Sequence, residues 1–190
     1  MINLRSLLIA ASLMLWSHAA VALEVNGVEV PEQIVQPGTQ QNLVLNGAGT
    51  REKFVFDIYV GALYLTRKSS DAGEILSITS PKRVTMDFLY SEISQKKMVN
   101  AWNEGFADNL GEYELITLKS QINTFNAAFG KTVKGDKVVI DFLDDGTTVV
   151  KINGEQKARI EEADFQRALL SIWLGESPVD SGLKAAMLGK

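Results

Sequence analysis

The sequence predicts an α+β fold in which a large antiparallel sheet packs against a layer of helices. Three observations favour this class. Segments that alternate apolar and polar residues precede and follow a central block, residues 94–130, that has helical periodicity. The turn dipeptides Asn26-Gly27 and Asn153-Gly154 each join two neighbouring strand patterns, as in antiparallel hairpins. A further helical pattern covers residues 161–174 and places Phe165, Leu169, Ile172 and Trp173 inward.

The first elements after the N-terminal segment are strands. Residues 23–30 alternate around Asn26-Gly27 and predict a hairpin that Pro31 ends. The polar segment 32–41 is expected to be a loop, and residues 42–45 a short strand.

The segment from Asn46 to Leu65 carries the densest signal. Gly47 and Gly49 are expected to form a loop that turns sharply ahead of Arg51 and leads into one long strand. The period of two predicts a core face made of Phe54, Phe56, Ile58, Val60, Ala62 and Tyr64. The opposite face mixes charged and apolar residues, namely Arg51, Lys53, Val55, Asp57, Tyr59, Leu63 and Leu65. This mixed face could form the floor of a pocket.

The middle of the chain predicts a strand between helices. A short helix over residues 72–78 can be capped by Ser70-Asp71, and residues 83–90 form a second core strand. Ser94 is expected to cap a helix that buries Met98, Trp102 and Phe106. One further helix, between Gly111 and Gly130, is expected to bury Leu115, Leu118, Ile122, Phe125 and Phe129.

A three-stranded meander and two helices follow. The expected strands are residues 137–143, 147–152 and 156–160, and a short helix over residues 180–188 follows the helix of residues 161–174. The acidic cluster Asp141, Asp144 and Asp145 lacks the spacing of a calcium-binding EF-hand loop, and turn formation explains Asp144-Asp145-Gly146. We predict no metal site.

The first 22 residues have the features of a secretory signal peptide. One basic residue, Arg5, precedes an apolar run, and Ala20-Val21-Ala22 forms a small-residue cleavage site. We therefore expect residues 1–22 to be removed and residues 23–190 to form one exported domain. The rival interpretation is an uncleaved anchor, but the run is shorter than the ~20 residues that a spanning helix needs. No stable membrane insertion is expected after cleavage.

Composition limits the chemistry. The chain has no cysteine, and its single histidine, His18, lies in the predicted signal peptide. A disulfide, a thiol nucleophile, a histidine base and a Cys/His zinc site are therefore excluded from the mature protein, and no cofactor is predicted. Removal of Arg5 leaves 18 basic and 23 acidic side chains, so the net negative charge disfavours a nucleic-acid partner.

Five motifs occur in order along the chain: Gly47-x-Gly49-x-Arg51, Lys53-Phe54, Tyr64-Leu65, Arg83-Val84-Thr85-Met86 and the helix end from Leu170 to Gly175. Together they resemble the chalcone isomerase-like family, and most closely its bacterial exported branch. The resemblance covers roughly the whole mature chain and implies an open-faced β-sandwich in which the large sheet and its helices enclose an apolar cleft. For a bacterial exported protein, it also implies a location in the periplasm.

The resemblance implies two possible activities. Arg51 matches the catalytic arginine of the isomerases, where a cation stabilises an enolate during cyclisation of an enone. The other catalytic positions match poorly: Tyr59 stands where the strand threonine is expected, and Ile172, beside Ser171, takes a hydroxyl position. The tyrosine expected near Ser94-Gln95 is absent, with Tyr90 the nearest, and Asn100 or Asn103 aligns only loosely with the asparagine. A non-catalytic branch of the family holds fatty acids.

Three hypotheses follow. The first is a periplasmic, non-catalytic protein that binds a small amphipathic or fatty acid-like ligand, with Arg51 as the anion anchor and Lys53, Tyr59, Tyr90 and Asn100 as further contacts. The second is an intramolecular lyase of the chalcone isomerase type, with Arg51 as its catalytic residue. The third is an envelope interaction protein whose cleft is filled by Tyr59, Trp102 and Trp173. A purely structural role would pair Arg51 with Asp57 or Glu52. The oligomeric state is not predicted.

Overall fold

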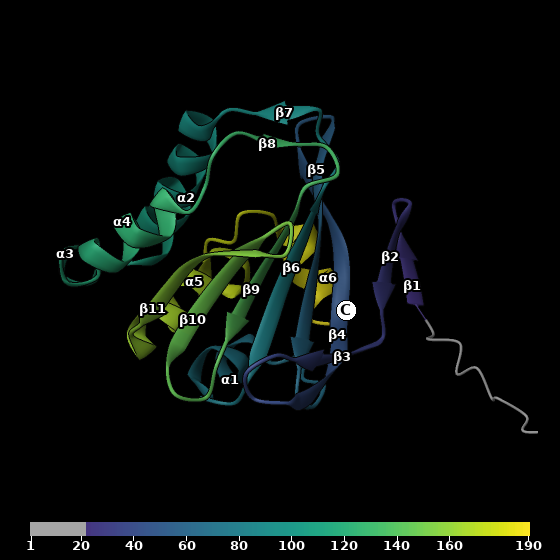
Figure 1. Cartoon of the computed structure of the whole chain (residues 1–190), viewed down its shortest axis with the longest axis horizontal. Coiled ribbons are helices and arrows are strands. Elements are labelled where there is room, and N and C mark those ends of the chain that lie inside the picture. Colours follow the sequence, from purple (N-terminus) through teal and green to yellow (C-terminus); the bar gives the residue numbers. More distant parts are fainter. Residues whose placement is uncertain (1–21) are drawn as a thin grey trace, which may run out of the picture.

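A computed structural model describes residues 22–190, which form a seven-stranded antiparallel sheet with helices on one face (Figure 1). The predicted signal peptide therefore lies, apart from Ala22, outside the described residues. The strands are β1 (Ala22–Val25), β2 (Val28–Pro31), β3 (Gln33–Gln36), β4 (Gln41–Lys53), β5 (Phe56–Leu65), β6 (Lys82–Phe88), β7 (Glu92–Ile93), β8 (Thr132–Val133), β9 (Lys137–Phe142), β10 (Thr147–Ile152) and β11 (Glu155–Glu161). The helices are α1 (Ala72–Ser77), α2 (Gln95–Asn109), α3 (Glu112–Thr117), α4 (Lys119–Ala127), α5 (Ala163–Leu174) and α6 (Ser181–Met187).

The predicted α+β class is confirmed. The sheet runs in the order β11-β10-β9-β6-β5-β4-β3, and the hairpin β1-β2 and the pair β7-β8 form two small sheets of their own. The principal core lies between the large sheet and the helices, where α2 packs on α5 and α6 packs on β4. A smaller apolar cluster on the other face joins β2, β4 and β5.

Most predicted elements form at the predicted places. Asn26-Gly27 and Asn153-Gly154 make two-residue turns with positive φ at both positions, as type I′ hairpins require. Ser94 caps α2, and Met98, Trp102 and Phe106 are buried as expected. The helix predicted after Gly111 is instead two helices, α3 and α4, that meet at Leu118.

The predicted loop over residues 32–41 is wrong in part, because residues 33–36 form the edge strand β3. The polar residues at both ends of this short strand, Gln33 and Gln36, leave no alternation of apolar and polar residues from which to predict it. The amide of Gln36 is fully buried and donates to the backbone oxygen of Lys82 and to the carboxylate of Asp141. The short pair β7-β8 was also not predicted.

The long strand predicted from Arg51 to Leu65 is wrong. Gly47, Gly49 and Arg51 belong to β4, which turns at Phe54-Val55 and returns as β5. The predicted core face is right in part. Ile58, Val60, Ala62 and Tyr64 are buried, the last three in the smaller cluster, but Phe54 and Phe56 are exposed. On the predicted mixed face, Tyr59, Leu63 and Leu65 join the principal core together with Ile58, because α6 and the other helices cover this face.

Candidate functional site

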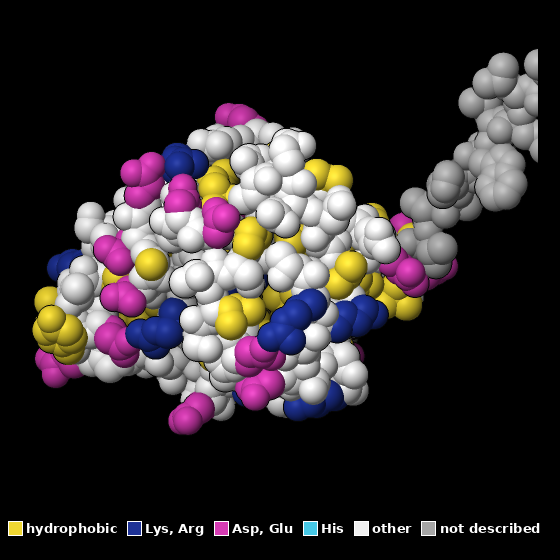
Figure 2. All heavy atoms as spheres, turned by 90° about the horizontal axis from the view of Figure 1, so that it is seen from below, with side chains coloured by type: hydrophobic (Ala, Val, Ile, Leu, Met, Phe, Trp, Pro, Cys, Tyr) yellow, Lys and Arg dark blue, Asp and Glu magenta, His cyan; other side chains and the backbone are white. Residues whose placement is uncertain are grey.

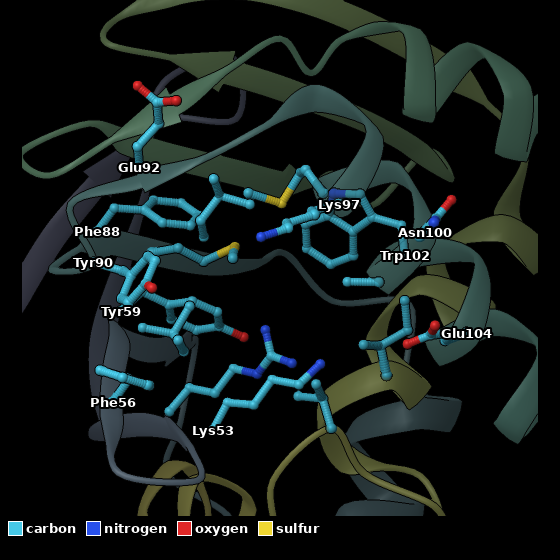
Figure 3. A pocket seen from close by; sticks show the side chains of 18 of the residues that line it. Lys53, Phe56, Tyr59, Phe88, Tyr90, Glu92, Lys97, Asn100, Trp102 and Glu104 are labelled. Carbon is cyan, nitrogen blue, oxygen red and sulfur yellow. The ribbon is translucent and has the colours of Figure 1, made fainter.

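A cavity of about 440 Å³ opens between the β4-β5 hairpin, β6 and α2 (Figure 3). Apolar side chains form most of its wall, among them Ile58, Met86, Phe88, Met98, Trp102 and Ile172. All five predicted ligand-binding residues line it: Arg51, Lys53, Tyr59, Tyr90 and Asn100. The hairpin places Arg51 directly opposite Tyr59 on neighbouring strands, where one strand had been expected to carry both.

Helix α6 explains the glycine motif ahead of Arg51. A Cβ atom at Gly47 would lie 2.0 Å from the backbone oxygen of Ala186, and one at Gly49 would lie 2.6 Å from the Ala186 side chain. The glycines therefore allow α6 to lie directly on the sheet, whereas the sequence had suggested a sharp turn. Asp180 caps α6 and accepts a hydrogen bond from the backbone of Glu52, so α6 begins beside Arg51. Arg51 follows the two glycines on the same face of β4.

Gly47→Ala tests this packing. The added methyl group must displace α6 from β4, so we expect a loss of about 1–3 kcal/mol in the free energy of unfolding, the usual cost of overpacking. Urea denaturation measures the loss. Gly130→Ala is the control, because no atom lies within 4 Å of its added Cβ. A Gly47 variant as stable as the Gly130 variant would contradict this role for the glycine.

Arg51 has no ion pair among residues 22–190. The expected structural partners are otherwise engaged: Asp57 accepts a hydrogen bond from Asn26, and Glu52 contacts Asp180 through its backbone. The guanidinium carbon lies 5.6 Å from the centre of the Tyr59 ring, within the range of a cation–π contact. Its Nε atom is buried and has no hydrogen-bond partner among the described residues. This donor is free to bind an acceptor.

Tyr59 is buried between Arg51 and the core. Burial raises the pKa of its hydroxyl, although the nearby Arg51 charge opposes this shift, so Tyr59 stays neutral at physiological pH. The hydroxyl oxygen accepts a hydrogen bond of 2.9 Å from Trp173 Nε1. Its own proton can therefore be donated to another group.

Trp102 supplies a second donor without a partner. Its Nε1 is buried and makes no hydrogen bond to any residue of 22–190, and its ring packs against Phe125, Phe129 and Trp173. Tyr59, Trp102 and Trp173 thus form a continuous aromatic wall, yet the cavity beside them stays open. The filled cleft that would favour the interaction-protein hypothesis is not observed.

Two lysines approach the cavity from opposite sides, Lys53 from β4 and Lys97 from α2 (Figure 3). Neither forms an ion pair in the part of the chain that the structure describes. Tyr90 is half-buried, and Asn100 is exposed on α2. Sequence reasoning missed Lys97, because this helix was interpreted only through its core positions; Lys97 directly precedes the buried Met98.

A second, smaller cavity of about 360 Å³ lies between α1 and α5. Lys82 lines it and is buried, and its Nζ donates to the backbone oxygens of Ile78 and Ser80. Burial lowers the pKa of this amine to about 8. Because both amine hydrogen bonds reach the backbone that follows α1, Lys82 has a structural role at this cavity.

Lys82 gives a pH-dependent contribution to stability. Between pH 8 and 10.5 the unfolded chain holds the Lys82 proton more strongly than the folded chain, so its contribution to the free energy of unfolding rises with pH. We expect the stability of the wild type relative to Lys82→Met to increase across this range, as measured by urea denaturation at several pH values. A difference that is constant with pH would contradict the buried amine.

The described residues contain no group of three His, Cys, Asp or Glu side chains that could hold a metal ion. Within residues 22–190 no helix is long and apolar enough to cross a membrane. On the face that Figure 2 shows, acidic and basic side chains are interspersed.

Comparisons with known proteins agree on the fold. A family model described as chalcone isomerase-like matches residues 22–189. Among solved structures, a fatty-acid binding protein from Arabidopsis thaliana is similar, with a TM-score of 0.60 and 16% sequence identity. The match covers 83% of this chain and 96% of the plant protein. No curated protein sequence matches the chain.

Proposed function

Because the chain belongs to the chalcone isomerase-like family and has its fold, we propose that it binds a small amphipathic or fatty acid-like ligand and does not transform it. The ligand's apolar part occupies the cavity between the β4-β5 hairpin and α2, and its anionic end meets Arg51. The plant structure of the same fold is itself named as a fatty-acid binding protein, which supports this ligand class.

The proposal rests on one observation: Arg51 is a partly buried cation without an ion pair among the described residues. A charged side chain that is partly buried ordinarily has a carboxylate partner or a full set of hydrogen bonds, since desolvating a charge is unfavourable. Within the described part of the chain Arg51 has neither, and it lines a cavity whose wall is mostly apolar. A carboxylate presents two oxygens that match the planar guanidinium. The neutral hydroxyl of Tyr59 and the free Nε1 of Trp102 are further donors at the same cavity.

The apolar wall supplies the attraction for the rest of the ligand. A chain of about twelve methylenes contributes roughly 10 kcal/mol of transfer free energy before the costs of association. Two carboxylates, Glu92 and Glu104, also line the cavity. The three cations Arg51, Lys53 and Lys97 outnumber them, which favours an anion over a cationic ligand.

The residues at the other positions that the resemblance marks as catalytic support binding without catalysis. Ser94 and Gln95, where the resemblance leads one to expect a tyrosine, are occupied with the helix: Ser94 accepts from the backbone of Lys97, and Gln95 donates to the backbone of Phe129. Asn103 accepts from Asn126. These polar groups serve the packing of α2 and α4, so none of them is available to orient an enone.

The proposal includes export. Residues 1–22 have the features of a signal peptide, and the match to the family begins at residue 22. We propose that the protein belongs to the exported bacterial branch and works in the periplasm as residues 23–190. N-terminal sequencing of the protein from a periplasmic fraction should give Leu23 as the first residue. Retention of Met1 in a cytoplasmic fraction would contradict this part.

Ligand identification tests the binding function. Native protein is denatured and extracted with organic solvent, and the extract is analysed by mass spectrometry. We expect close to one equivalent of an apolar carboxylic acid, and calorimetry should show that the stripped protein binds a fatty acid of the same length. Protein that is empty and ignores fatty acids would refute the proposal. Turnover of a panel of chalcones would instead favour the isomerase.

A further inference from the structure

The tip of the β4-β5 hairpin exposes three consecutive apolar side chains beside the cavity. Phe54 is 88% exposed, Val55 87% and Phe56 51%. Phe54 and Phe56 also line the cavity, and Phe56 packs edge-on against Tyr90 at 5.5 Å between ring centres. The apolar tip and the apolar cavity are therefore one continuous surface.

The backbone of this tip is strained. Phe54 has a φ of 59°, a conformation that an aromatic residue rarely adopts. The other two-residue turns of the large sheet and of the β1-β2 hairpin use Asn-Gly at this place, with Asn153-Gly154 and Asn26-Gly27. A positive φ at the first turn residue alone fits a type II′ turn, in which Gly is preferred. Phe54 thus introduces backbone strain while its exposed ring gains little from burial on folding, which points to a role outside folding.

Three features identify the partner surface. The tip is too small for a stable protein–protein interface, which buries about 800 Å² on each partner. The exposed residues that flank the tip include the carboxylates Glu52 and Asp57 as well as Lys53, so attraction by net charge is not the basis of the contact. Lys53 has no ion pair among the described residues and can meet an individual lipid phosphate. Aromatic side chains with a lysine beside them suit the boundary between lipid headgroups and acyl chains. A bilayer also holds the kind of amphipathic molecule that the cavity fits.

We propose that the Phe54-Val55-Phe56 tip inserts transiently into the surface of a phospholipid bilayer, where ligand passes between the acyl chains and the cavity. The inference rests on the proposed function for its cargo, but contact with the bilayer is a separate property of the tip. Insertion buries the three exposed side chains, and it places the cavity mouth at the level of the headgroups.

Flotation of the full mature protein with vesicles tests the proposal. The vesicles contain phosphatidylethanolamine and phosphatidylglycerol, and the protein is first stripped of ligand. Val55→Asp should reduce vesicle binding about tenfold or more, because the side chain that would enter the acyl region becomes charged. Val55 does not line the cavity, so the affinity for free fatty acid in the absence of vesicles should stay unchanged, while transfer of fatty acid from vesicles slows.

Phe54→Gly distinguishes an effect on vesicle binding from an effect on the stability of the fold. Glycine relieves the positive φ, so the melting temperature should stay equal or rise while vesicle binding falls. Ile116→Ser is the matched control, because Ile116 is 67% exposed on α3, away from the hairpin, and should keep full vesicle binding.

Three results would overturn the proposal. They are vesicle binding that is equal in all variants, no binding by the wild type, or a wild type that self-associates through the tip in analytical ultracentrifugation. Loss of the proposed ligand function gives a different result: a protein that floats with vesicles but takes up no fatty acid.

Discussion

Arg51→Gln is expected to weaken the binding of a long-chain carboxylic acid by about 10- to 150-fold, as measured by calorimetry. A hydrogen bond to a charged group contributes ~1.5–3 kcal/mol, which corresponds to this change in affinity. The glutamine side chain keeps much of the length of arginine and can still donate a hydrogen bond to the carboxylate. The loss of affinity therefore measures the contribution of the positive charge and of the paired hydrogen bonds of the guanidinium. The fold should be unaffected, because Arg51 makes no ion pair among residues 22–190.

A methyl ester of the same acid is the matched ligand control. The ester lacks the negative charge, so Arg51→Gln should change its affinity much less than that of the acid. Arg67→Gln is the protein control, since Arg67 is exposed and pairs with Glu74 away from the cavity. An equal loss of affinity for the acid and the ester would show that Arg51 shapes the cavity and does not bind the carboxylate.

The second large effect is expected on the other face of the sheet, at Asp141. This carboxylate is 1% exposed and receives two hydrogen bonds from Arg83, at 2.6 and 3.0 Å, and one from Gln36 at 3.0 Å. Lys151 lies 3.6 Å away. Asp141→Asn removes the only carboxylate of this network and leaves Arg83 nearly buried without compensation, which typically destabilises by about 3–5 kcal/mol. Urea denaturation measures the loss.

Glu161→Gln is the control for Asp141. The pair of Arg159 and Glu161 is exposed on both sides, so its loss should change the free energy of unfolding by less than about 1 kcal/mol. Changing both partners, in the double variant Arg83→Met with Asp141→Leu, should recover much of the stability, because no unpaired charge of the pair remains. If Asp141→Asn is as mild as the control, the network does not hold the strands together.

Periodic patterns predicted the architecture because each element buries one face. The meander, α2 and α5 are clear in the sequence, since their apolar residues repeat at the spacing that burial requires. Strand β3 could not be predicted this way. Its burial depends on Gln36, whose amide nitrogen donates to partners more than forty positions away. Asp141 was considered only as part of an acidic cluster for the same reason, because its hydrogen-bond partners Arg83 and Gln36 are distant in the chain.

Of the candidate site, the sequence predicted residues but not geometry. Arg51, Lys53, Tyr59, Tyr90 and Asn100 all line the cavity, but whether they bind a ligand stays a prediction. The hairpin at Phe54-Val55 was missed because its first residue breaks the usual turn chemistry. The donors left free at Arg51 and Trp102 depend on where α6, α4 and α5 pack, which no local pattern specifies.

The aromatic wall beside the cavity makes the mature protein its own optical probe. Trp16 lies in the predicted signal peptide, so Trp102 and Trp173 would be the only indoles of residues 23–190. Their rings are 5.7 Å apart, one lines the cavity and the other donates to Tyr59. Tryptophan fluorescence of the mature protein therefore arises wholly beside Arg51, the proposed anchor of the carboxylate. A shift of the emission spectrum would report that ligand occupies the cavity, without any attached dye.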